Sequence, residues 1–283
     1  MKPQYQHELM TSFLLWFDNH LLQKGEAYSN KTGTLYGFED SRLPSSYKVF
    51  ASPYKQWVSD SSITGEVNPI IPTSFVGLDR TDDLIFDFEN GRVIETGGNL
   101  IGNEVLTGEF AVKDFNVYFT NETEEDLIIE NDYEINSRII PREQKPIAPY
   151  DQVVPAVFFN TTFAQNKGFA FGGMEETTTK IIATVMSEDS YMLDGVLSIF
   201  ADSHNENIAI IPMEKHPFNE FNDLKSGIYN YKNLSKEHNK CNGMYVNGVA
   251  TSKLTDRARK SLSNDIFVGF IDFELQQHRF RHQ

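Results

Sequence analysis

Residues 177–212 read TTTKIIATVMSEDSYMLDGVLSIFADSHNENIAIIP, and this stretch determines the fold prediction. Its first part alternates like a strand, because Ile181, Ala183 and Val185 alternate with Lys180, Ile182 and Thr184. The polar sequence SEDS follows at residues 187–190. Either serine of that turn, Ser187 or Ser190, is expected to be the N-cap of a helix.

The helix that follows this turn has one apolar face, formed by Met192, Leu193, Val196, Leu197 and Phe200. A second apolar run, residues 208–211, ends before Pro212. The stretch therefore predicts a strand–helix–strand unit within an α+β fold. No phosphate-binding glycine loop follows the strand and no nucleophile motif lies at the turn, so we interpret the unit as a scaffold.

The composition is that of a globular, acidic chain. It has 283 residues, of which 40% are apolar, and this length is sufficient for a packed core. The 22 Phe and 12 Tyr favour a β-rich architecture. The chain has 40 acidic and 25 basic residues, and a net charge of −15 argues against a broad surface for binding DNA or membranes. With Cys241 as its one cysteine, the chain can form no internal disulfide, and no apolar signal segment is expected at its start.

The clearest helix signal covers residues 8–24, where apolar side chains form a wide stripe. Gly25 stands at the position expected for a C′ glycine. Two interpretations of the stripe stay open. It packs into the core, or Trp16 and Phe17 are partly exposed and contact another subunit.

A β-hairpin is predicted at residues 84–95, LIFDFENGRVIE. Asn90 and Gly91 suit a two-residue type I′ turn, in which both have positive φ. That turn pairs Phe88 with Val93 and Glu89 with Arg92. Further short strands are expected at 47–51, 55–58, 104–112, 115–120, 127–129, 133–135 and 153–159.

The last strand is expected at residues 266–275, IFVGFIDFEL. It is apolar on both faces at its start, so a central place in a sheet is predicted. The terminal QQHRFRHQ is interpreted as a solvated or partner-contacting tail. The candidate interface residues are Trp16, Phe17, Trp57, Arg279 and Arg281.

No motif predicts a catalytic, cofactor-binding or metal-binding residue, since G-x-S-x-G, P-loop, H-E-x-x-H and C-x-x-C patterns are missing from the sequence. The acidic run 122–126 is interpreted as a solvated loop, and Asp79, Asp82 and Asp83 as a turn. Two alternatives stay open. One is a β-rich glycan hydrolase that uses Asp87 or Asp272, and the other is a carbohydrate-binding module with exposed aromatics in residues 47–57.

The order of the helix at 8–24, the unit at 180–203 and the strand at 266–275 resembles tail-terminator and neck, or tail-completion, proteins of tailed bacteriophages. The resemblance implies a single α+β domain with a mixed, mostly antiparallel sheet that carries two helices on one face. Residues 26–150 would form a β-rich insertion, and residues 151–283 the core and the C-terminal strand. The proline-rich connector 141–149 is the expected boundary.

The same resemblance implies a structural virion protein that forms a homo-oligomeric ring, with six copies expected. It would contact tail tube or sheath proteins and neck or head-connector proteins, while DNA passes through the lumen without specific binding. The expected location is the virion, after assembly in the host cytoplasm, with no membrane contact. Within this class, a head-completion or baseplate protein is the alternative.

Overall fold

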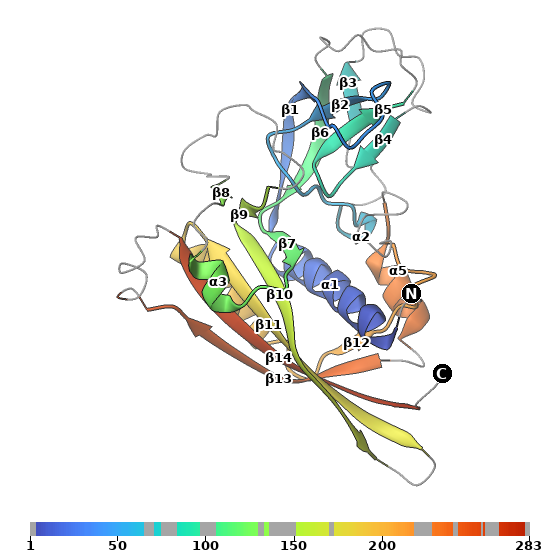
Figure 1. Ribbon diagram of the computed structural model, residues 1–283, viewed down its shortest axis with the longest axis vertical. Helices are drawn as coiled ribbons and strands as arrows, with labels where there is room; N and C mark the ends of the chain where they lie inside the picture. The colour runs from blue at the N-terminus through green and yellow to red at the C-terminus, as the bar shows by residue number, and fades with distance from the viewer. Residues whose placement is uncertain are drawn as a thin grey trace.

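The computed structural model describes residues 4–64, 71–74, 84–96, 106–129, 133–135, 151–169, 173–217, 228–239, 243–255, 257 and 266–280. These residues build two six-stranded sheets, and Figure 1 shows them as an upper and a lower lobe with helix α1 (Tyr5–Lys24) beneath the upper one. A parallel pair, β8 (Glu134–Ile135) and β9 (Val153–Val154), lies beside the junction.

The larger sheet has the strand order β12-β13-β14-β11-β10-β7. Its strands are β7 (Asn116–Phe119), β10 (Ala156–Gly168), β11 (Met174–Ser187), β12 (Asn207–Ala209), β13 (Gly243–Lys253) and β14 (Phe267–Phe280). All neighbours pair antiparallel except β7 and β10, which are parallel, so the sheet is mixed and mostly antiparallel. The predicted α+β class and the central position of the last strand are confirmed.

Helices α1 and α4 (Ser190–Ala201) pack on the same face of this sheet and share its main hydrophobic core. Phe17 of α1 stacks on Phe200 of α4 with ring centroids 3.9 Å apart, and Phe273 of β14 meets both rings edge-on. Gly269 makes room for α4, because a Cβ there would lie 2.9 Å from Leu193 Cδ1. The arrangement of two helices on one face is therefore the predicted one.

Part of the opposite face of the larger sheet is covered by the short helix α3 (Glu124–Ile129). The sequence prediction was wrong here, since 127–129 was expected as a strand and 122–126 as a loop. Thr123 and Asp126 cap each other: Thr123 Oγ1 donates to Asp126 Oδ2 at 2.7 Å and accepts from the Asp126 amide at 3.2 Å. Acidic side chains in a first turn also suit the positive end of the helix dipole.

The start of α4 also differs from its prediction. The N-cap is Asp189, whose side chain accepts a hydrogen bond from the amide of Tyr191 at 2.9 Å. Ser187 instead accepts from the amide of Asp189 at 3.2 Å, and Ser190 is the first helical residue. The Asp189 carboxylate accepts from one free amide of the first turn, as a serine could, and adds a negative charge at the positive end of the helix dipole, which a serine cannot.

The smaller sheet has the order β3-β6-β1-β2-β5-β4 and its own apolar cluster around Phe50, Trp57 and Phe110. Its strands are β1 (Tyr28–Phe38), β2 (Lys48–Ala51), β3 (Ile71–Ser74), β4 (Leu84–Asp87), β5 (Arg92–Glu95) and β6 (Leu106–Lys113). The long β1 was not predicted, because its polar sequence SNKTGT lacks apolar alternation. Two further short helices, α2 (Ser61–Thr64) and α5 (Tyr231–His238), lie near the junction of the lobes.

The predicted hairpin exists as β4 and β5, but its turn type and register were wrong. Asp87 pairs with Arg92 and Phe86 with Val93, so residues 88–91 form the loop. Gly91 has φ 59°, whereas Asn90 is not among the described residues with positive φ. Two contacts explain the longer loop: Asp87 accepts from the Asn90 amide at 3.1 Å, and the Phe88 ring is buried.

Candidate functional site

Two of the candidate interface residues, Trp16 and Phe17, are buried inside the chain. Their exposed fractions are 4% and 0%, so the core-packing interpretation holds and their place among the candidate interface residues was wrong. Trp16 Nε1 donates to Glu206 at 3.3 Å, and its ring meets Phe13 with centroids 5.5 Å apart. The wide apolar stripe of α1 serves the core, because the helix is enclosed by the sheet, α4 and the segment after β12.

Trp57 is buried as well, with an exposed fraction of 1%. Its ring stacks on Phe110 with centroids 4.9 Å apart, and its Nε1 donates to Ser52 Oγ at 3.2 Å. Trp57 fills the core of the smaller sheet, so it provides no exposed aromatic platform for a carbohydrate.

Arg279 lies near the end of β14, whereas Arg281 lies outside the described residues, as do Cys241 and Asp79, Asp82 and Asp83. The guanidinium of Arg279 lies over the Tyr5 ring at 3.9 Å, and its Nε donates to Thr177 Oγ1 at 3.0 Å. The interpretation of 276–280 as a tail was therefore wrong, since these residues pair with β11 as far as Phe280.

The outer parts of β10, β11 and β14 form a three-stranded arm, which projects from the larger sheet away from the smaller one (Figure 1). β7 pairs with β10 only from Ala156 to Phe159. Among the described residues, no strand pairs with the other side of β10 beyond that point. We call residues 161–168 the β10 outer edge, and every one of them is exposed.

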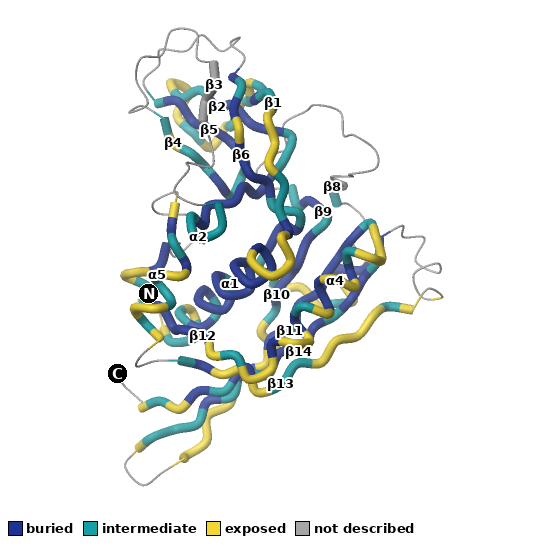
Figure 2. The backbone as a smooth tube through the Cα atoms, turned by 180° about the vertical axis from the view of Figure 1, so that it is seen from behind, coloured by how far each residue is buried: buried dark blue, intermediate teal, exposed yellow. Residues whose placement is uncertain are grey.

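A second free edge lies at the opposite side of the same sheet. β12 pairs with β13 from Gly243 to Tyr245, and Val246 bonds the segment just before β12. Within the described ranges, no strand covers residues 247–253, which we call the β13 outer edge. Figure 2 shows an exposed stretch along this part of β13 and another at the end of the arm. The sheet thus offers backbone hydrogen-bonding groups at both sides.

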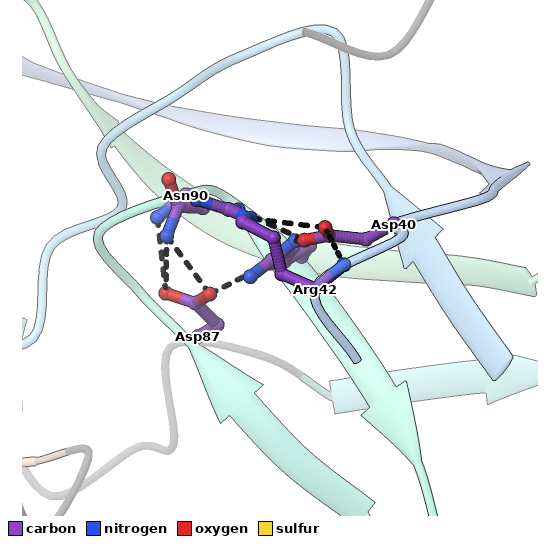
Figure 3. Close-up of polar contacts among 5 residues, drawn as sticks. Asp40, Arg42, Asp87 and Asn90 are labelled. Atoms are coloured by element: carbon purple, nitrogen blue, oxygen red, sulfur yellow. Dashed lines mark hydrogen bonds and ion pairs between the residues drawn. The ribbon is translucent and has the colours of Figure 1, made fainter. Parts of the chain in front are cut away.

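A largely buried network of charges links the loop after β1 to the β4–β5 hairpin (Figure 3). Arg92 donates from Nη1 to Asp40 at 2.7 Å and from Nε to Asp87 at 2.6 Å. Hydrogen bonds from Arg42 and Arg92 hold the pKa of Asp40 well below its usual range. A cavity of about 660 Å³ adjoins Asp40, but each of these charges already has an ion-pair partner. We therefore interpret the network as one that stabilises the hairpin.

The carboxylates proposed for a hydrolase lie in different sheets, Asp87 on β4 and Asp272 on β14. Asp87 is bound by Arg92 and Asn90. Near Asp272, Glu124 lines a cavity of about 360 Å³ on the α3 face. Burial raises the pKa of Glu124, and the charge of Asp272 adds to that effect.

The part of the chain that the structure describes contains no group of three or more His, Cys, Asp or Glu side chains arranged to hold a metal ion. None of the helices in the same residues has both the length and the hydrophobicity required to span a bilayer. No protein-family model matches the chain, and no curated protein matches it either.

Sequence reasoning did not find either outer edge. β13 was expected only at Met244–Val246, and its extension to Lys253 was not recognised because NGVATSK has little apolar alternation. In β10 the run TTFAQNKG follows the apolar residues that were recognised. The threonines in both runs and Val249 in the second were the available signal, since β-branched residues favour strands.

Proposed function

We propose that this chain is a structural subunit of a tailed-bacteriophage particle, and that it forms a homo-oligomeric ring as a tail terminator or neck component. One observation carries the proposal: α1 and α4 cover one face of a mixed sheet that, in the described part of the chain, has a free edge at each side. The helix–sheet arrangement is the one that the resemblance to terminator and neck proteins implies. Free edges at both sides of a subunit suit assembly in a ring.

The charge of the chain agrees with a ring through which DNA passes. A net charge of −15 would repel phosphates if acidic side chains face the lumen, so that the genome moves through without binding. The proposed partners are tail tube or sheath proteins on one side of the ring and neck or head-connector proteins on the other. A head-completion or baseplate position is the alternative within the same class.

Immunogold electron microscopy of tailed particles tests the proposal. Antibodies raised against the purified chain should label the junction of head and tail in particles whose genome encodes it. Labelling at the distal end of the tail would move the assignment to a baseplate protein. Purified particles that contain none of this chain by mass spectrometry would contradict a virion role.

A glycan hydrolase is the second candidate function, and Glu124 favours it because its pKa is raised beside a cavity. A raised pKa suits a general acid in glycoside hydrolysis. The test measures release of reducing sugars from cell-wall polysaccharide by the wild type and by Glu124→Gln. Activity that Glu124→Gln abolishes, with the fold intact, would support the hydrolase over the virion protein.

A further inference from the structure

The two outer edges of the larger sheet match each other in the properties that decide strand pairing. They cover similar lengths, residues 161–168 on β10 and 247–253 on β13, and all of the former and most of the latter are exposed. Each carries a single charged residue, Lys167 or Lys253. Neither contains proline, so an added strand would find the backbone donors and acceptors of each edge, which runs regularly from Phe163 on β10 and from Gly248 on β13.

The strand directions allow these edges to pair between copies. β13, β14, β11 and β10 are antiparallel neighbours in this order, so β10 and β13 run in opposite directions. A second copy can therefore lie beside the first in the same orientation. Its β13 then runs antiparallel to β10 of the first copy. Antiparallel pairing needs no crossover between the strands and gives well-aligned hydrogen bonds.

The two edges are also staggered along the sheet. Thr161 pairs with Ile181 of β11, and Val249 pairs with Phe273 of β14. Because Ile181 and Phe273 pair with each other, Thr161 and Val249 lie in the same row of paired residues, which runs across the sheet perpendicular to the strands. The β10 edge extends from this level toward the tip of the arm, and the β13 edge extends mostly the other way. A neighbour must shift along the strands, and strands tilted to a ring axis absorb such a shift, as they do in a β-barrel.

Face alternation selects a register for the pairing. Ala164 and Thr251 both belong to residue rows on the helix-covered face, since Ala164 is level with Leu275 and Thr251 pairs with Ile271. With Ala164 opposite Thr251, Gln165 lies opposite Ala250 and Lys167 opposite Gly248. The apolar and polar faces then continue from one copy to the next, and the two lysines do not face each other.

We propose that the β10 outer edge of one copy pairs antiparallel with the β13 outer edge of the next copy, with Ala164 opposite Thr251. The partner is thus a second copy of this chain, and the contact is head-to-tail, so each copy uses one edge on each side. Contacts of this type generate rings when the rotation closes and filaments when it does not. The inference rests on the proposed function, for which it supplies the contact between subunits.

Matched charge variants test the contact, because both substituted positions are exposed and lie outside the core. Ala164→Lys with Thr251→Lys places like charges opposite each other at every contact. Ala164→Lys with Thr251→Glu places opposite charges there, with the same number of substitutions. The lysine–lysine variant should need about fivefold more protein for half-assembly in analytical ultracentrifugation, whereas the lysine–glutamate variant should assemble like the wild type.

Cysteine cross-linking gives an independent readout, in a Cys241→Ser background that removes the native thiol. A chain with Gln165→Cys and Ala250→Cys should yield a ladder of multimers under mild oxidation, and each single variant should yield only the monomer. Dimers of Gln165→Cys alone would show that the β10 edge pairs with itself, which overturns the proposal. Far-ultraviolet circular dichroism spectra and melting temperatures of each variant, compared with those of the wild type, verify that the fold is kept.

The outcomes separate the contact from the proposed function. If the wild type forms rings, but the two charge variants assemble alike and no ladder appears, the edge contact is wrong and the ring-forming role stands. If the wild type stays a single chain at every concentration, both the ring and the edge contact are overturned.

Discussion

Asp18 of α1 forms an ion pair of 2.9 Å with Lys113 at the end of β6, and both side chains are buried. The pair joins the helix that packs on the larger sheet to a strand of the smaller one. Burial raises the pKa of Asp18, and the nearby ammonium of Lys113 counteracts part of that rise. The two lobes are therefore connected by a charge pair as well as by the chain itself.

Removal of one partner of this pair should destabilise the protein strongly. Asp18→Ala leaves the ammonium of Lys113 buried without its counter-ion, and we expect a loss of about 3–5 kcal/mol in the free energy of unfolding. Urea denaturation measures it. Lys180→Ala is the control, since Lys180 and Glu274 lie 4.0 Å apart and are both exposed, and it should cost less than about 1 kcal/mol. Equal losses in the two variants would contradict a structural role for the buried pair.

A methyl group at Gly269 should disturb the contact between β14 and α4. Its Cβ would lie 2.9 Å from Leu193 Cδ1 and 3.1 Å from Leu197 Cδ1, and both leucines are buried. We expect Gly269→Ala to lower the free energy of unfolding by about 1–3 kcal/mol. Gly33→Ala is the matched control in another strand, because its Cβ would lie at an ordinary 3.8 Å from the Phe110 ring. A Gly269→Ala variant as stable as the control would show that α4 does not pack this closely.

Glu89 should make stability depend on pH. Burial raises its pKa from 4.5 to about 7, although Lys113 and the Gln56 amide, which donates at 2.6 Å, favour the charged form. Between these two pH values the folded state holds a proton that the unfolded state has released. The contribution of Glu89 to stability is therefore present below about pH 4.5 and is lost as the pH rises toward 7.

Glu89→Gln tests this sign, because the amide keeps an oxygen that can accept from Gln56 and does not ionise. The free energy of unfolding of the wild type should fall relative to the variant by on the order of 1–3 kcal/mol between pH 4.5 and 7. Denaturation series at several pH values measure the difference. A constant difference across this range would mean that Glu89 titrates as an ordinary carboxyl group.

Residues after Leu275 were interpreted from the sequence as a tail, which could be truncated with the fold intact, and the structure changes that expectation. Residues 276–280 pair with β11, Gln276 Nε2 donates to Glu176 at 2.7 Å, and Arg279 stacks on Tyr5. Their removal exposes an edge of β11, so the melting temperature should fall by several degrees. Truncation after Phe280 is the control and should melt like the full chain. Indistinguishable melting of the two truncations would restore the tail interpretation.

The α+β core was predictable because its apolar periodicity is strong. The faces of α4 and β14 follow from Leu193, Leu197, Ile271 and Phe273, all of which lie in the core as expected. Other elements are set by contacts between distant residues. β1 forms because β6 and β2 pair with it on either side. Asp87 lengthens the loop of the β4–β5 hairpin, because it binds Arg92 and Asn90. A pattern that is read locally contains no signal for such contacts.

The candidate surface could not be predicted for the same reason. Trp16, Phe17 and Trp57 are large and apolar, and only the packed structure shows that each has partners inside the chain. The two outer edges consist of small and polar residues, so no single side chain marks them. They become visible only when the short partners β7 and β12 are seen to end before β10 and β13 do.

The most direct test of a ring-forming subunit is the mass of the purified full chain in solution. Native mass spectrometry, with negative-stain images of the same sample, should show one closed ring whose mass is a fixed multiple of the 32.3 kDa chain, with six copies expected. A single species of 32.3 kDa across all accessible concentrations, with no rings in the images, would contradict the account.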